Sequence, residues 1–153
     1  MKQGRFRKSE KLFRKALTIR QIEFGERNFV TAISLSSLAK LYRKQGQFEK
    51  AEQLLQKALD IRQTELGQYH PDTALIVNEL GELYWTKGLK EKSKDFFQQA
   101  LETMQGRLNT GHPSLERVQN NLVNPQQTLD QEKYQSTSAL QSIFTRLRRR
   151  YPR

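Results

Sequence analysis

The chain has 153 residues, a length that bounds it to a single domain, and a formal net charge of +11 at pH 7. It contains no cysteine, which excludes disulfides, thiol catalysis and cysteine metal sites. It also lacks any run of about 18 apolar residues and any apolar N-terminal stretch, so the sequence predicts neither a membrane span nor a signal peptide.

The first expected element is a helix over residues 5–24, and it contains a sequence motif that recurs along the chain. Phe13-Arg-Lys-Ala-Leu returns at intervals of 42 residues as Leu55-Gln-Lys-Ala-Leu and as Phe97-Gln-Gln-Ala-Leu. A period of this length indicates one supersecondary unit stacked on copies of itself, rather than a single globular core. We therefore interpret residues 1–25 as the second half of a partial repeat.

This N-terminal helix is expected to be strongly basic and to present an open apolar stripe. Residues 1–25 hold 8 basic and 2 acidic groups, which give a net charge of +6. The stripe, which lacks the first helix of its own repeat, consists of Phe6, Phe13, Leu17 and Ile22. Large open apolar patches mark association sites, so weak self-association through this helix is expected.

Residues 26–67 and 68–109 are predicted to form two complete pairs of antiparallel helices. In the first helix of each pair, Leu38-Ala-Lys-Leu-Tyr returns as Leu80-Gly-Glu-Leu-Tyr, and the apolar positions recur at helical spacing. A glycine, Gly46 in the first pair, follows each first helix, where glycine suits the left-handed residue that ends a helix.

The two histidines, His70 and His112, are interpreted as residues that start helices. Each precedes a proline, which is tolerated in the first helical turn, and Asn28 holds the equivalent position one repeat earlier and can cap its helix. Because repetition explains both histidines, we assign them no metal or acid–base role. No nucleophile–base pair or glycine-rich phosphate loop is apparent, so the sequence predicts a protein that is not an enzyme and needs no cofactor.

The C-terminal part departs from the repeat. Residues 110–123 are expected to form the first helix of another partial repeat, which a proline ends at position 125. Residues 124–135 are interpreted as a polar linker, and residues 136–153 as a basic amphipathic helix. The apolar stripe of that helix is Leu140, Ile143, Phe144 and Leu147. A cap over the last repeat, a membrane or nucleic-acid helix and disorder are its alternatives.

The recurring residues resemble a tetratricopeptide repeat. Those that carry the resemblance are Leu38, Ala39, Tyr42, Gly46, Gln47, Phe48, Ala51, Ala58 and Leu59. That family has a period of about 34 residues, and the longer second helix with its Leu-Gly-x-x-His-Pro linker is similar to the repeats of kinesin light chains and related bacterial proteins. The resemblance implies for residues 1–123 an all-α, right-handed superhelical solenoid of antiparallel helix pairs, with about two full repeats plus two half repeats.

In such a solenoid the first helices line the concave face, which implies a protein-interaction scaffold that binds a peptide segment, with acidic peptides as candidates. The implied groove residues are Ser36, Ser37, Lys40, Arg43, Lys44, Asn78, Glu79, Glu82, Trp85, Asn120 and Asn121. The asparagines can bond a peptide backbone. The cations, which are expected to be exposed, either pair with acidic side chains or are solvated. Trp85 is either an anchor or packed against the next repeat.

The alternative function is non-specific binding of nucleic acid or an anionic membrane through the basic ends. Residues 110–153 hold 7 basic and 3 acidic groups, which add +4 at the C-terminal end. Beyond Phe6 no exposed aromatic residues are expected among the basic ones, which weakens a stacking platform for nucleic acid, and a protein or peptide partner is preferred. A cytoplasmic location is expected.

Overall fold

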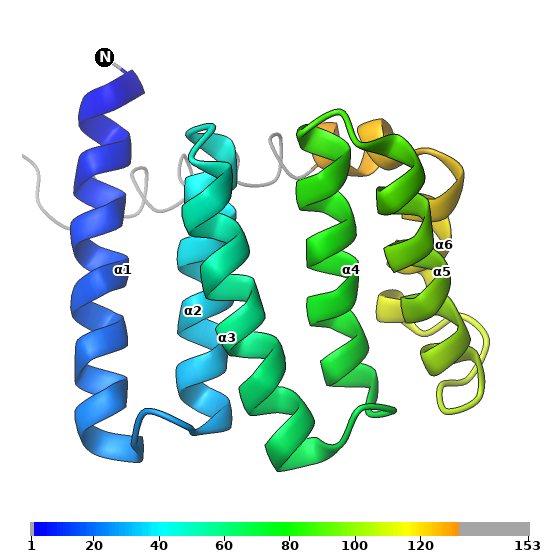
Figure 1. Cartoon of the computed structure of the whole chain (residues 1–153), viewed down its shortest axis with the longest axis horizontal. Coiled ribbons are helices and arrows are strands. Elements are labelled where there is room, and N and C mark those ends of the chain that lie inside the picture. Colours follow the sequence, from blue (N-terminus) through cyan, green and yellow to red (C-terminus); the bar gives the residue numbers. More distant parts are fainter. Residues whose placement is uncertain (1, 132–153) are drawn as a thin grey trace, which may run out of the picture.

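The computed structural model describes residues 2–131, and every regular element among them is a helix. The helices stand side by side in a row, with α1 at one end and α5 and α6 at the other (Figure 1). Their bounds are Lys2–Phe24 (α1), Phe29–Lys44 (α2), Phe48–Leu66 (α3), Pro71–Thr86 (α4), Lys90–Gln105 (α5) and Pro113–Val123 (α6).

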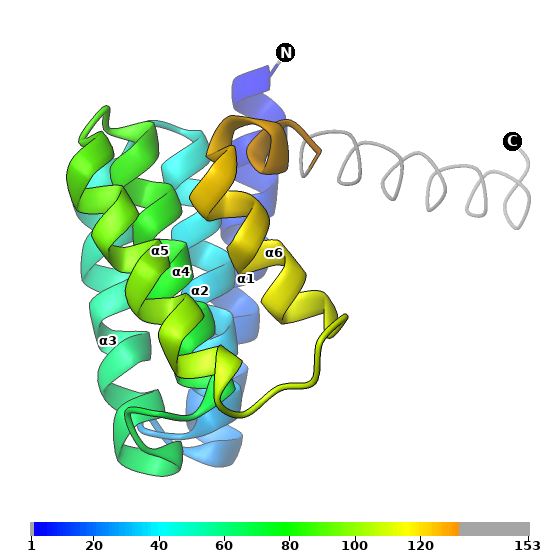
Figure 2. The same ribbon diagram turned by 90° about the vertical axis from the view of Figure 1, so that its right-hand side faces the viewer.

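The array curves towards the side formed by α2, α4 and α6. Within each complete repeat the first helix packs on the second, α2 on α3 and α4 on α5. Across repeats α4 contacts both α2 and α6, whereas α1, α3 and α5 make no such contact with one another within residues 2–131. Figure 2 shows α3 and α5 towards one side of the molecule and α6 towards the other. Because the first helices lie closer together than the second helices, their side is the concave face.

The three first helices begin with the same cap. The Asn28 Oδ1 atom accepts a hydrogen bond from the Val30 backbone amide at 2.8 Å. His70 and His112 hold the equivalent positions, and the Nδ1 atom of each accepts from the amide two residues later, at 3.1 and 3.2 Å. Each cap satisfies an amide that has no partner inside the helix. The interpretation of both histidines as helix-start residues is therefore confirmed.

A left-handed glycine ends the first helix of each complete repeat. The φ angle is 74° at Gly46 and 83° at Gly88, values that side chains other than glycine rarely adopt. After Gly46 the chain closes back on the helix, and the Gln47 amide donates to the Tyr42 carbonyl at 2.9 Å. The turn thus provides a hydrogen-bond donor for a carbonyl group at the helix end, and it directs the chain into the second helix.

A tyrosine–glutamate hydrogen bond joins α1 to α2 and, one repeat later, α3 to α4. The Tyr42 hydroxyl donates to Glu10 Oε1 at 2.8 Å, and the Tyr84 hydroxyl donates to Glu52 Oε1 one repeat later. The partners are 32 residues apart in both pairs. These hydrogen bonds are the main reason that the pKa values of Glu10 and Glu52 lie below the ordinary value. The sequence analysis did not identify this recurring joint.

The two complete repeats fill the same volume with different residues. Phe97 is fully buried, and a Cβ added at Gly81 would lie 2.6 Å from its Cδ1 and Cε1 atoms. In the preceding repeat the equivalent positions hold Leu55 and Ala39, both of which are buried. A larger residue on the second helix is thus matched by a smaller one on the first helix, as close packing requires.

The structure differs from the expected linker at 124–135, because residues 125–131 are helical. The Asn124 Oδ1 atom accepts a backbone amide at 3.3 Å in the first turn. Pro125 opens the helix, where its missing amide removes no helical hydrogen bond. Leu129 is buried. Pro125 is buried as well. The glutamine-rich composition concealed this helix, since few apolar side chains mark its packed face.

Residues 132–153 lie outside the described part of the chain, and with them the expected basic helix at 136–153. The domain limits given for this end therefore stay a prediction. Among the described helices, none is long and apolar enough to cross a membrane.

We predict that Gly81→Ala lowers the free energy of unfolding by about 1–3 kcal/mol, because the added Cβ overpacks against Phe97. Urea unfolding followed by circular dichroism measures the loss. The double variant Gly81→Ala/Phe97→Leu resembles the preceding repeat and should cost less than the sum of the single substitutions. Gly106→Ala is the matched control, since nothing lies within 4 Å of its added Cβ. Strict additivity of the two substitutions would contradict the packing argument.

Candidate functional site

The centre of the concave face is a buried carboxylate, Glu82 on α4. Its side chain is 1% exposed. Arg43 from α2 places Nη2 3.3 Å from Glu82 Oε2, and Arg117 from α6 places Nη2 2.7 Å from Glu82 Oε1. One carboxylate therefore binds cations from the first helices on both sides of its own repeat.

Two buried asparagines complete this cluster, which we name the Glu82 network: Arg43, Asn78, Glu82, Arg117 and Asn121. The Asn78 Nδ2 atom donates to Glu82 Oε1 at 3.0 Å. The Asn121 Nδ2 atom donates to the same oxygen at 3.0 Å and to Asn78 Oδ1 at 2.8 Å. Both asparagines are fully buried. Two of the three amides expected to bond a peptide backbone are thus bonded to each other and to Glu82.

The charges around Glu82 keep its carboxyl group ionised. Burial raises the pKa of Glu82, but the charges of Arg117 and Arg43 outweigh burial, and the net shift is below the ordinary value. Removing charges from water is costly, and the pairing and hydrogen bonds of the Glu82 network offset that cost. The network therefore constrains where the three first helices lie relative to one another.

A second ion pair joins α2 to α4 closer to the solvent. The Lys40 Nζ atom lies 2.8 Å from Glu79 Oε1, and the Lys40 side chain is 32% exposed. Water screens the lysine end of this pair, whereas the Glu79 side chain is only 11% exposed. Lys40 consequently stays accessible to a ligand, although it already has an acidic neighbour.

The structure places the expected groove residues on the three first helices but buries more than half of them. The buried ones are Ser36, Arg43, Asn78, Glu79, Glu82 and Asn121. Ser37, Lys40 and Trp85 are half-buried, and Lys44 and Asn120 are exposed. The expectation that Arg43 is exposed was wrong, because Glu82 holds its guanidinium between α2 and α4. Direct ligand contact is open mainly to the half-buried and exposed residues.

Trp85 lies at the end of α4 beside the turn into α5. The Lys90 Nζ atom is 5.2 Å from the centroid of the Trp85 ring, within the range of a cation–π contact. The ring is therefore packed in part against its own repeat, and part of it stays accessible. This contact lies within the repeat of Trp85 itself, so it is neither of the two alternatives, packing against the next repeat and contact with a ligand.

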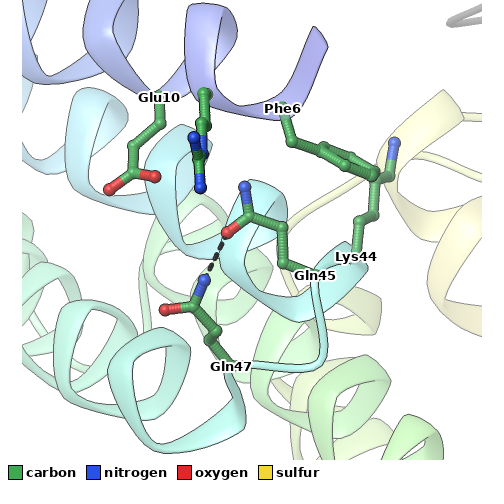
Figure 3. A pocket seen from close by; sticks show the side chains of 6 residues that line it. Phe6, Glu10, Lys44, Gln45 and Gln47 are labelled. Atoms are coloured by element: carbon green, nitrogen blue, oxygen red, sulfur yellow. Dashed lines mark hydrogen bonds between the residues drawn. The ribbon is translucent and has the colours of Figure 1, made fainter. Parts of the chain in front are cut away.

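A cleft that the sequence analysis missed lies between α1 and the turn that joins α2 to α3 (Figure 3). Its volume is about 410 Å³, and its lining residues are Phe6, Arg7, Glu10, Lys44, Gln45 and Gln47. The Gln47 Nε2 atom donates to Gln45 Oε1 at 2.6 Å, and this bond holds two of the lining amides together. Two chain segments far apart in the sequence form the cleft, so no local pattern predicts it.

The chain matches a known family and several solved structures. The family model described as tetratricopeptide repeat matches residues 1–64 and 43–106. The structure of BtubC (BKLC) from P. vanneervenii is similar at a TM-score of 0.69 and 22% identity, over 98% of this chain and 61% of that chain. The nearly identical TPR-like repeats of a kinesin light chain-like protein from Podosopora anserina are similar at a TM-score of 0.68 and 21% identity, over 99% and 71%. No curated protein matches the chain.

We predict that Arg43→Glu lowers the free energy of unfolding by about 3–5 kcal/mol, because it replaces a buried ion pair with two facing carboxylates. Lys40→Glu on the same helix should cost less, because the Lys40 side chain is 32% exposed whereas that of Arg43 is 7% exposed. Urea unfolding of both variants measures the difference. Equal losses in the two variants would contradict the different burial of the two cations.

We also predict that acid removes part of the folding stability through Glu82. An unfolded carboxyl titrates near 4.5, and the pKa of Glu82 in the folded protein is lower. The stabilisation is therefore complete above the unfolded pKa and is lost as the pH falls through the folded pKa. Unfolding measured from neutral to acidic pH should show a shallower decrease for Glu82→Gln, which also starts from a lower stability.

The matched control for this pH dependence is Glu102→Gln on α5. Glu102 is exposed and accepts a hydrogen bond from Gln98 at 2.9 Å, so this variant should keep the wild-type slope. If Glu82→Gln also kept the wild-type slope, other carboxylates would account for the acid sensitivity.

Proposed function

The chain belongs to the tetratricopeptide repeat family, and we propose that it binds an acidic peptide segment along its concave face. The fold of this family is a non-catalytic scaffold for protein–protein interaction. To that general role the proposal adds that the binding site is the concave groove, that the ligand is a peptide segment and that this segment is acidic.

The charge of the concave face is the observation that supports the proposal. Beyond their first turns, α2, α4 and α6 carry four cations and two carboxylates, which leaves a net charge of +2 on this part of the helices. The cations are Lys40, Arg43, Lys44 and Arg117, and the carboxylates are Glu79 and Glu82. Both carboxylates already pair with cations inside the protein. Asp72 and Glu116 lie in the first turns of α4 and α6, at the end of the concave face away from Lys44. A positive potential at a concave surface attracts acidic segments and selects against basic ones.

The accessible residues of the groove have the chemistry that an extended peptide requires. Lys40 and Lys44 lie one turn apart on α2 and can pair with acidic side chains. Asn120 on α6 is exposed, and its amide can both donate to and accept from a peptide backbone. Charge contacts on one wall and backbone contacts on the other would orient the bound segment.

The buried residues contribute by holding the groove in one shape. The Glu82 network fixes the spacing of α2, α4 and α6. When the groove is already formed before binding, less of the interaction free energy is lost in ordering its side chains and helices. Glu82, Asn78 and Asn121 are therefore positioning residues in this proposal, and they need not touch the peptide.

The groove continues into the cleft of Figure 3, because Lys44 belongs to both. Beside Lys44 the cleft contains Arg7, the two amides of Gln45 and Gln47, and Glu10, whose carboxylate is already bonded to Arg14 and Tyr42. The cations and the amides supply donors that suit a carboxylate, either a side chain or the end of a peptide. We place the acidic part of the peptide at this end of the groove.

Lys44→Glu should weaken binding of an acidic peptide by roughly three- to tenfold at low salt, because it turns an attractive charge into a repulsive one. Fluorescence anisotropy with labelled acidic, neutral and basic peptides of equal length measures this. Asn120→Ala should weaken the binding of every peptide that binds, irrespective of charge. Lys57→Glu, an equally exposed reversal on α3 away from the groove, is the matched control.

The proposal would be wrong if acidic and basic peptides bound alike, or if Lys57→Glu and Lys44→Glu had the same effect. An RNA oligonucleotide and anionic vesicles in the same assay test the alternative function. Tighter binding of either one than of the acidic peptides would favour that alternative instead.

A further inference from the structure

Glu79 on α4 is a second buried carboxylate of the concave face, and fewer cations contact it than contact Glu82. Glu79 is 9% exposed. Arg43 and Arg117 both pair with Glu82, whereas among residues 2–131 only Lys40 lies within 4 Å of the Glu79 carboxylate. A ligand carboxylate that paired with Lys40 would therefore compete with Glu79. A buried charge that loses its partner is costly, so this competition opposes the binding of acidic ligands.

Arg62 on α3 supplies a further positive charge on the side of Glu79 away from the groove. α3 packs against both α2 and α4 (Figure 1). The Arg62 Cζ atom lies 4.4 Å from the centroid of the Phe29 ring on α2, and its Nη1 atom lies 3.3 Å from Asp72 Oδ2 on α4. Contacts with both first helices thus hold the guanidinium group between them.

Arg62 and Glu79 are close enough for their charges to interact. Glu79 follows Asp72 by two helical turns on α4, so the two carboxylates share the face of α4 that Arg62 contacts. Burial lowers the pKa of Arg62, and the charges of Asp72 and Glu79 oppose that shift.

The two groups also have unused hydrogen-bonding capacity of opposite kind. Within residues 2–131 the Arg62 Nε atom, a donor, and the Glu79 Oε2 atom, an acceptor, are buried without a hydrogen-bond partner. The Glu79 carboxylate can therefore turn towards Arg62 when its contact with Lys40 is lost.

The two cations that act on Glu79 differ in their access to a ligand. The Lys40 side chain is 32% exposed at the groove, whereas the Arg62 side chain is 8% exposed. A peptide carboxylate can reach Lys40 but not Arg62. When Lys40 turns to the peptide, the positive charge of Arg62 stays beside Glu79 and lowers the cost of the exchange.

We propose that Arg62 is a positioning residue that sets the affinity of the groove for acidic peptides, because it compensates Glu79 while Lys40 pairs with the ligand. This inference rests on the proposed function. Arg62 does not touch the peptide and acts through Glu79 and Lys40. The competition between Glu79 and the ligand then selects for peptides that place a carboxylate, rather than an amide, beside Lys40.

Fluorescence anisotropy with an acidic peptide, and with its counterpart in which glutamine replaces each acidic residue, tests this at low salt. Glu79→Gln should strengthen binding of the acidic peptide by roughly three- to tenfold, since Lys40 loses its competing carboxylate. Arg62→Gln should weaken it by a similar factor. In the Glu79→Gln background the effect of Arg62→Gln should fall below about twofold. A general loss of positive charge would act equally in both backgrounds.

Three further variants isolate the charge of Arg62 from its other contacts. Arg62→Lys keeps the charge and should retain most of the binding. Asp72→Asn breaks the ion pair of Arg62 with α4 but leaves its charge in place, so it should not weaken binding. Arg107→Gln removes an exposed arginine after α5 and is the matched control. Circular dichroism and urea unfolding establish that each variant is folded.

A measurement without any peptide separates this inference from the proposed function. Lys40→Met/Arg62→Gln leaves Glu79 without either cation, so the urea midpoint should fall by more than the sum of the two single shifts. Adding Glu79→Gln should recover part of that loss. If no acidic peptide bound the wild-type chain, the proposed function would fail, while this coupled loss would still show that Arg62 compensates Glu79.

Three results would overturn the inference. The first is a loss of peptide binding in Arg62→Gln that is the same with and without Glu79→Gln. The second is strict additivity of the urea midpoint shifts of Lys40→Met and Arg62→Gln. The third is an Arg62→Gln variant that does not fold and that Glu79→Gln does not restore, because its contacts with Phe29 and Asp72 would then account for the role of Arg62.

Discussion

One buried carboxylate constrains the whole concave side of the array. Glu82 stays ionised without contact with solvent only while Arg43 and Arg117 reach it from α2 and α6. If either outer helix moved away, a buried charge would lose its partner, and that loss is costly. The spacing of three consecutive first helices therefore depends on the charge balance around one side chain. Lys40, Lys44 and Asn120, the accessible residues of the groove, take their relative positions from it.

The helices and their order were predictable because their signals are local. A cap such as Asn28 or His70 acts within one turn, and the apolar spacing identifies the packed face. The contacts of Arg43 were not predictable in that way, since they depend on how closely α2 and α4 approach. The sequence did contain a signal for the network. Arg43 and Glu82 are 39 residues apart, and Glu82 and Asn121 are separated by the same number. This separation is about one helical turn shorter than the repeat. Opposite or complementary polar residues at that offset mark contacts between neighbouring first helices.

The accessible residues of the groove act on a partner through charge. These charges lie on a rigid frame, and the attraction they exert is long-ranged and weakened by salt. The sequence predicted the open apolar stripe of α1 from the repeat, and Phe13 and Ile22 are indeed exposed. It could not predict that Phe6 and Leu17 of the same stripe pack against the core, because α2 reaches them from the following repeat.

The recurring tyrosine–glutamate joint has a consequence for how such a chain can arise and fold. Tyr42 with Glu10 and Tyr84 with Glu52 span the same short stretch of sequence, so each joint closes a loop of equal and modest length. Nothing in either bond requires a distant part of the chain, which favours rapid folding from any point along the array. A duplication of the coding segment for residues 26–67 would carry Tyr42 and Glu52, and so both halves of a joint, with it. The new unit would dock on its neighbour at once, without any compensating substitution.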